Sequence, residues 1–191
     1  MALTYSLKDE LGKPAPDFSL QGVMGVAGAQ EKRYSLESFK DARALVVIFM
    51  CNHCPYVVAV QERINNLAKL FAPQGVALVG INSNDSLRYP DDNFQAMQVR
   101  AREQSYTFPY LLDETQNVAK AYGAVCTPDP YVFENVAGRF LLRYHGRIDD
   151  NWKEPHKVSR QDLALALEAI LTGGKISLDS APSMGCSIKW K

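Results

Sequence analysis

Along the chain, continuous apolar runs typical of buried strands alternate with apolar residues at helical spacing, as in α/β proteins. The run ALVVIFM, residues 44–50, contains no polar residue and predicts a central strand that is covered on both faces. The next segment, YVVAVQERINNLAKLF, repeats apolar residues at helical spacing and ends near Pro73 and Gly75, which predicts a helix. VALVGINS, residues 76–83, predicts a second buried strand.

The second half of the chain predicts further elements. Residues 90–105 begin with a proline and two acids, which is a helix-entry signal. Residues 110–124 predict a short strand and a short helix, residues 129–149 a hairpin, and residues 159–174 an amphipathic helix. The early alternation favours parallel strands with covering helices, and the hairpin adds antiparallel strands. The pattern therefore predicts one α/β domain with a mixed central sheet flanked by helices.

The two ends of the chain show less pattern than its middle. The start, up to KPAPDFSL, predicts an extended N-terminal extension, and KISLDSAPSMGCSIKWK reads as an irregular C-terminal tail. We expect one domain over residues 1–173 and a tail over residues 174–191.

The composition is that of a soluble globular protein and argues against a nucleic-acid or anionic-membrane binder. The 191 residues are 47% hydrophobic and 22% charged, as in ordinary soluble proteins. Lys plus Arg and Asp plus Glu are both 21, so the basic excess of a nucleic-acid or anionic-membrane binder is absent. No signal-peptide pattern and no apolar run of membrane-spanning length occurs, which predicts a cytoplasmic protein with no membrane partner.

Candidate chemistry lies in CNHCP, at the junction between the first buried strand and the helix after it. Cys51 follows the strand, Cys54 falls in the first helical turn, and Asn52 and His53 separate them. In a cytosolic chain such a pair is more often catalytic or metal-binding than structural. Backbone N–H groups at a helix N-terminus favour negative charge, so we expect a lowered pKa for Cys51, with a cationic His53 stabilising its thiolate.

Two other interpretations of this pair stay open. Two core cysteines could fall at this spacing by chance. A structural zinc site would need four ligands, often as two pairs, but Cys126 and Cys186 are 60 residues apart and form no second pair. We therefore predict a redox dithiol without metal or cofactor, and keep a non-catalytic zinc-binding module as an alternative.

The chain resembles the redoxin branch of the thioredoxin-fold superfamily, which groups AhpC/TSA-like and TlpA/ResA-like proteins. The matching segments, between Leu11 and Asp150, are LGKPAPDFSL, CNHC, DETQNVAKAYGAVCTPDPYVF and GRFLLRYHGRIDD. The resemblance implies a thioredoxin-like domain in which Pro128 is cis and packs against the dithiol. It also implies that Thr127 exposes a backbone edge to which the main chain of a substrate pairs.

The same resemblance implies a thiol–disulfide oxidoreductase. Cys51 would attack a protein or small-molecule disulfide and Cys54 would resolve the mixed disulfide, with a thioredoxin or glutathione system as electron donor. The buried acid of thioredoxins is missing, since its position is Leu45. A peroxiredoxin-like thiol peroxidase is the alternative, although Ala44 and Ile48 replace the proline and threonine of a peroxide site.

The remaining candidate residues carry weaker signals. We expect Cys126 to be a small buried hydrophobe, the common state of a free cysteine, with an extra resolving thiol as the alternative. For Cys186 the sequence does not decide between an extra thiol at the site and inert packing. We expect the acids to serve in turns or helix entry, the histidines to be surface or core polar residues and the aromatic residues to pack. These are Asp85, Asp91 and Asp92, then His145 and His156, then Tyr89, Trp152 and Trp190.

Overall fold

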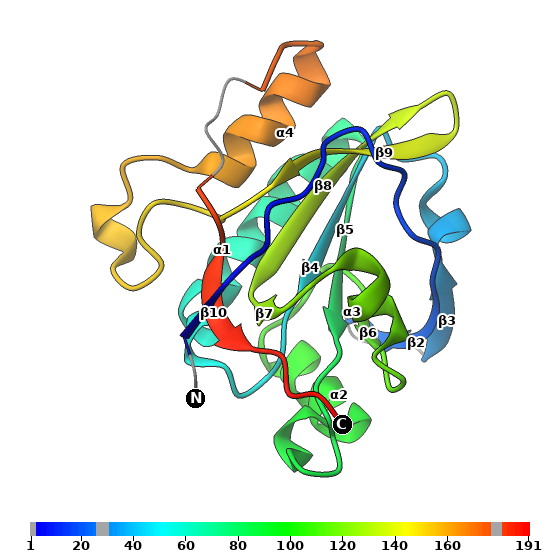
Figure 1. Ribbon diagram of the computed structural model, residues 1–191, viewed down its shortest axis with the longest axis vertical. Helices are drawn as coiled ribbons and strands as arrows, with labels where there is room; N and C mark the ends of the chain where they lie inside the picture. The colour runs from blue at the N-terminus through cyan, green and yellow to red at the C-terminus, as the bar shows by residue number, and fades with distance from the viewer. Residues whose placement is uncertain (1–2, 26–30, 177–180) are drawn as a thin grey trace.

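The computed structural model describes residues 3–25, 31–176 and 181–191, and its centre is a seven-stranded mixed sheet (Figure 1). The strand order is β3-β2-β6-β5-β4-β8-β9. These strands are β2 (Ser19–Val23), β3 (Lys32–Ser35), β4 (Ala44–Phe49), β5 (Val76–Asn82), β6 (Tyr110–Leu112), β8 (Asp129–Val136) and β9 (Arg139–His145).

The strand β4 occupies the middle of this sheet, as its unbroken apolar run predicted. All six of its residues are buried, because β4 pairs in parallel with β5 on one side and antiparallel with β8 on the other. Val47 lies between Val79 and Tyr131 in this register. The predicted hairpin is confirmed as β8 and β9, which turn at Ala137 and Gly138.

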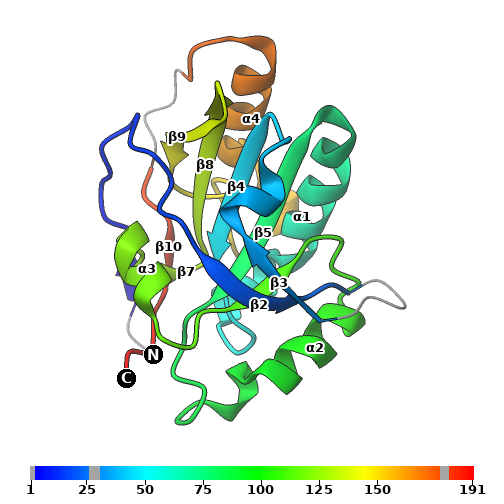
Figure 2. The same ribbon diagram turned by 90° about the vertical axis from the view of Figure 1, so that its right-hand side faces the viewer.

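Helices cover both faces of the sheet (Figure 2). On one face lie α1 (Pro55–Phe71), α2 (Phe94–Glu103) and α4 (Asp162–Thr172), and on the other lies α3 (Asn117–Tyr122). The short 3₁₀ segments are η1 (Leu36–Phe39), η2 (Ala72–Gln74), η3 (Pro90–Asp92) and η4 (Pro155–Lys157). No helix in the described part of the chain has the length and apolar character needed to cross a membrane.

One predicted helix begins later than its sequence signal indicated. Residues 90–92 form the separate 3₁₀ segment η3, and α2 begins after Asn93. The side chain of Asn93 accepts a hydrogen bond from the backbone N–H of Ala96 at 2.8 Å and so caps the helix. The proline and the two acids therefore precede α2 instead of forming its first turn, and the second acid, Asp92, is fully buried.

The C-terminal tail is not irregular throughout, which corrects the expectation from the sequence. Residues 184–187 form β10 (Met184–Ser187), the middle strand of a small antiparallel sheet with β1 (Leu3–Tyr5) and β7 (Cys126–Thr127) (Figure 1). The alternation of Met184 and Cys186 with glycine and serine is a short strand signal that the sequence analysis missed, and the pairing depends on partners far away in the sequence. Residues 177–180 of the tail lie outside the described residues.

Candidate functional site

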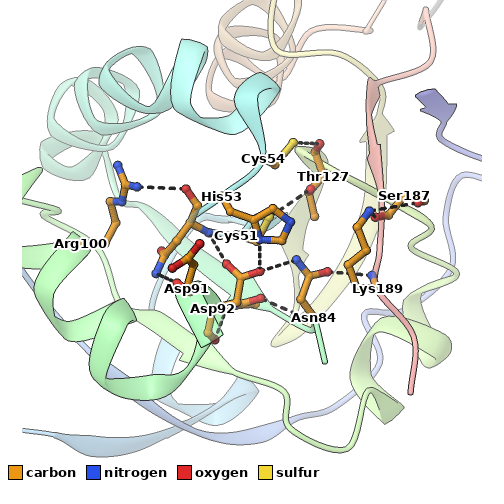
Figure 3. Close-up of polar contacts among 12 residues, drawn as sticks. Cys51, His53, Cys54, Asn84, Asp91, Asp92, Arg100, Thr127, Ser187 and Lys189 are labelled. Carbon is orange, nitrogen blue, oxygen red and sulfur yellow. Dashed lines mark hydrogen bonds and ion pairs between the residues drawn. The ribbon is translucent and has the colours of Figure 1, made fainter. Parts of the chain in front are cut away.

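The two cysteines of CNHCP lie where β4 ends and α1 begins. Cys51 follows the strand, and Cys54 is the N-cap of α1, with Pro55 at the first helical position. Cys51 is 2% exposed and Cys54 is fully buried, and neither is in a disulfide. Both sulfurs contact Thr127, because Cys51 Sγ lies 3.5 Å from Thr127 Oγ1 and Cys54 Sγ lies 3.1 Å from the Thr127 carbonyl oxygen (Figure 3).

The peptide bond between Thr127 and Pro128 is cis, as the resemblance implied. It places Thr127 beside the dithiol although 73 residues separate Thr127 from Cys54. The strand–helix junction and the cis-proline loop therefore form one site.

The hydrogen bond between the two cysteines lowers the pKa of Cys54 and raises the pKa of Cys51. A hydrogen bond from the Cys51 thiol lowers the pKa of Cys54 to about 5, against the opposing effect of burial, and further donors are Cys186, Thr127 and the backbone N–H of Val57. The same bond to Cys54 raises the pKa of Cys51, as do its burial and the charge of Asp92. The contact of Cys54 with the Thr127 carbonyl oxygen favours the thiol form of Cys54, whereas the four donors favour the thiolate.

This assignment corrects the expectation of a low-pKa Cys51. The sequence placed both cysteines near a helix N-terminus, but only Cys54 occupies the N-cap, where backbone N–H groups stabilise an anion. Cys51 lies before the first turn, next to a buried carboxylate that opposes a second negative charge.

The spacer residue Asn52 is held by four neighbours. Its backbone N–H donates to Asp92 Oδ1 at 2.7 Å, and its side-chain amide donates to the Asp91 carbonyl at 2.7 Å. Tyr110 donates its hydroxyl to Asn52 Oδ1 at 3.1 Å, and Arg100 donates to the Asn52 carbonyl at 3.0 Å. Because these bonds fix the backbone between the cysteines, Asn52 sets the distance and orientation of the two sulfurs.

The second spacer residue, His53, forms an ion pair with Asp92, which the sequence analysis interpreted as a helix-entry acid. His53 Nδ1 lies 2.6 Å from Asp92 Oδ2 (Figure 3). The His53 ring stacks on Tyr89 with the centroids 5.4 Å apart. The hydrogen bond to Asp92 raises the pKa of His53. The positive charge of His53 is therefore shared with Asp92, rather than directed at Cys51 alone as expected.

Asp92 is the main residue of the site that sequence reasoning missed, since it was interpreted as a helix-entry acid. Its side chain is fully buried and also accepts from the Asn84 side chain at 2.7 Å, while its backbone carbonyl accepts from the Asn82 side chain at 2.9 Å. A signal was present, because Asn82 and Asn84 end the parallel strand β5 beside β4. The carboxyl ends of parallel strands meet at one edge of a sheet, where sites form.

The possible metal ligands are few. Among the residues that the structure describes, one group of three ligand atoms lies within 4.8 Å, from Cys51, His53 and Asp92. The four cysteines do not form such a group in the described part of the chain. The four-cysteine zinc alternative therefore gains no support from the arrangement.

The two remaining cysteines lie on neighbouring strands of the small sheet. Cys126 is fully buried, as expected, and burial raises its pKa. Cys186 lies opposite Thr127 in the pairing of β10 with β7, and its thiol is hydrogen-bonded to Cys54. The backbone edge of Thr127 that the resemblance implied to be exposed is thus occupied by the chain's own β10, and Thr127 is 2% exposed.

A cavity of about 240 Å³ lies next to the cis-proline. It is bordered by Pro128, by Val60 of α1, by Met184 of β10 and by Trp152. Trp152 also packs on Tyr56 with ring centroids 4.2 Å apart, so the packing role expected for this tryptophan is confirmed.

Comparison with known proteins places this site in a family. The AhpC/TSA family profile matches residues 11–150, whereas no curated protein matches the sequence. An uncharacterized conserved protein from Geobacillus kaustophilus is 43% identical, with a TM-score of 0.87 over 100% of this chain and 97% of that one. A hypothetical protein from Sinorhizobium meliloti is 39% identical, with a TM-score of 0.86 and 98% of each chain covered.

A more distant match shows the fold alone. The reduced 2-Cys peroxiredoxin from Plasmodium vivax is 15% identical, with a TM-score of 0.60 over 85% of this chain and 97% of that one. The sheet order, the cis-proline loop and the family match agree with one another. The protein belongs to the AhpC/TSA family, a redoxin family of the thioredoxin-fold superfamily.

Proposed function

We propose that the protein is a thiol–disulfide oxidoreductase that uses a Cys51–Cys54 dithiol to exchange disulfides with protein or small-molecule thiols. The observation that carries this proposal is the hydrogen-bonded pair of Cys51 and Cys54, in which both sulfurs contact Thr127 and the pKa of Cys54 is lowered to about 5. Such a thiolate is populated at neutral pH and makes its site reactive.

The shared hydrogen bond suggests the order of steps. The Cys51 thiol transfers its proton to the Cys54 thiolate and attacks the substrate disulfide, which forms a mixed disulfide and releases one substrate thiolate that is protonated by solvent. Cys54 then gives up its proton to the second substrate sulfur and attacks Cys51. The products are two substrate thiols and the Cys51–Cys54 disulfide, which a thioredoxin or glutathione system would reduce.

Peroxidase activity has less support in this site. The positions aligned with the proline and threonine of a peroxide site, Ala44 and Ile48, are fully buried in β4 and carry no hydroxyl. Approach to Cys51 is restricted for every substrate, because Cys51 is 2% exposed and β10 occupies the edge of Thr127. We propose that a substrate side chain docks in the cavity beside Pro128, which borders the cis-proline but neither cysteine.

The experiment is turnover of a protein disulfide by the reduced protein with glutathione or thioredoxin as donor. Cys51→Ser and Cys54→Ser are expected to abolish turnover, and Cys54→Ser to accumulate a mixed disulfide on Cys51. Cys126→Ser is the matched control, because Cys126 is equally buried yet lies outside the pair. Full turnover by Cys51→Ser would refute the proposal.

Two further measurements separate the alternatives. Peroxide consumption that is lost in Cys51→Ser but kept in Cys54→Ser would favour a thiol peroxidase. Stoichiometric zinc that protects Cys51 and Cys54 from thiol reagents would favour a zinc-binding module, with His53 and Asp92 as the neighbouring ligands.

A further inference from the structure

A third cysteine reaches the dithiol from the C-terminal end of the chain. Cys186 lies between two strands, opposite Leu3 of β1 and opposite Thr127 of β7. Thr127 is the residue that contacts both Cys51 and Cys54. Cys186 is 2% exposed and packs in the same apolar cluster as the other two cysteines, so three sulfurs share one buried region.

The backbone of β10 is seated directly against the cis-proline loop. A Cβ atom built on Gly185 would lie 1.9 Å from the Thr127 carbonyl oxygen, so only glycine permits this approach. Beyond β10 the chain is fixed by hydrogen bonds from the Ile188 N–H to the Val125 carbonyl and from the Lys189 N–H to Asn84 Oδ1, both at 2.9 Å. The fold therefore holds Cys186 beside Thr127, between β1 and β7.

We propose that Cys186 is a third redox-active thiol, which attacks Cys54 in the Cys51–Cys54 disulfide and forms a Cys54–Cys186 disulfide. This inference rests on the proposed function, which supplies the first disulfide. One sulfur–sulfur bond forms and one breaks, so no further oxidant is needed. The proton that leaves Cys186 is taken up by the Cys51 thiolate that departs.

The arrangement favours Cys54 as the partner of Cys186. The two thiols are already hydrogen-bonded, so a small movement of their side chains brings the sulfurs to the roughly 2.05 Å of a disulfide. Cys126 is unsuited, because it neighbours Thr127 along β7, and successive side chains of a strand point to opposite faces.

The pKa of Cys186 falls when the pair is oxidised. In the reduced protein the pKa of Cys186 is raised to about 12, first by burial and then by the hydrogen bond and the charge of Cys54, whereas the charge of Lys189 lowers it. A Cys51–Cys54 disulfide removes the charge of Cys54, so the pKa of Cys186 falls and the fraction of Cys186 present as thiolate increases.

The exchange has a structural consequence. The Cys54–Cys186 disulfide ties β10 covalently to the start of α1 and keeps the edge of β7 covered. The oxidised protein therefore contains either the Cys51–Cys54 or the Cys54–Cys186 disulfide, and the second of these keeps β10 over the site. Reduction of the second disulfide would be required before β10 can separate from β7.

The test uses the Cys51→Ser variant, which retains Cys54, Cys126 and Cys186. The variant is incubated with oxidised glutathione, digested with trypsin without reduction and analysed by mass spectrometry. We expect a disulfide between the peptides of residues 44–63 and 176–189, and the loss of two of the three thiols. The control Cys51→Ser/Cys186→Ser leaves Cys54 with Cys126, and we expect no bond between residues 44–63 and 121–139.

A persistent glutathione adduct on Cys54 of Cys51→Ser, with Cys186 still a thiol, would overturn the proposal. The proposed function is tested separately, since the wild-type protein would still form Cys51–Cys54 and turn over its substrate in that case. Gly185→Ala in the Cys51→Ser background tests the placement, because displacement of β10 should slow the cross-link about tenfold or more. An unchanged rate, with the fold verified by circular dichroism, would show that the β7–β10 pairing does not position Cys186.

Discussion

The Asp92 carboxylate accepts a hydrogen bond from the backbone N–H of Asn52 at 2.7 Å, across 40 residues of sequence. This contact joins the spacer of the dithiol to the segment before α2. Because the Asp92 side chain is fully buried and also pairs with His53 and Asn84, one carboxylate organises three polar groups.

Replacement of Asp92 should destabilise the protein strongly. Asp92→Ala leaves the donors of Asn52, His53 and Asn84 without their acceptor, and we expect a loss of about 3–5 kcal/mol in the free energy of unfolding. Asp91→Ala is the matched control, because the Asp91 side chain is exposed, and it should change that free energy by less than about 0.5 kcal/mol. Urea unfolding measures both values, and equal effects would contradict the role assigned to Asp92.

The contribution of His53 to stability should depend on pH. The pKa of His53 is raised in the folded protein by Asp92, so the ion pair stabilises the fold fully below the unfolded pKa of about 6.5. This contribution is lost as the pH rises through the folded pKa.

The difference in unfolding free energy between wild type and His53→Ala should therefore be about 1–2 kcal/mol at pH 5.5 and smaller at pH 9. Urea unfolding across this pH range checks the expectation, with His156→Ala as a control, since His156 is exposed. A difference that grows with pH would reverse the sign and refute the ion pair.

The Cys54 thiolate should titrate near pH 5 and should depend on its neighbour. Absorbance at 240 nm of the reduced protein should rise through a midpoint of about 5. Cys51→Ala removes the strongest of the four donors to Cys54 and should move this midpoint upward, whereas Cys126→Ser should leave it unchanged. If the low midpoint disappears in Cys54→Ser but not in Cys51→Ala, the helix N-terminus rather than the Cys51 thiol stabilises the anion.

A second buried pair supports the strand that follows the cis-proline. His145 Nε2 lies 2.8 Å from Asp129 Oδ1, and His145 Nδ1 lies 2.8 Å from Asp9 Oδ2. The sequence treated His145 as a surface or core polar residue, and the structure places it in the core at 7% exposure.

Loss of this histidine should destabilise the fold, because Asp129 is fully buried and burial raises its pKa. We expect His145→Ala to lower the free energy of unfolding by about 3–5 kcal/mol at pH 7. His145→Ala/Asp129→Asn should recover part of this loss, since no charge is then left buried. Thermal and urea unfolding of both variants measure the effect, and a double variant less stable than His145→Ala would contradict the explanation.

The sequence by itself determined the elements whose stability is local. The apolar run of β4, the helical repeat of α1 and the turn between β8 and β9 each follow from a period or a turn residue. The position of Cys51 and Cys54 at a strand–helix junction follows from the same patterns. These features depend on neighbours within a few residues, so one sequence is enough to predict them.

The tertiary structure decided what depends on distant segments. It placed Asp92 under the dithiol spacer, assigned the low pKa to Cys54 and brought Cys186 on β10 to the edge of Thr127. No local pattern encodes a contact between residues 40 or more positions apart. Met184 and Cys186 alternate with Gly185 and Ser187, but this four-residue alternation does not reveal which strands β10 pairs with. The cysteine pair could therefore be predicted from the sequence, whereas the buried Asp92 carboxylate beside it and the neighbouring Cys186 depend on distant segments that the fold brings together.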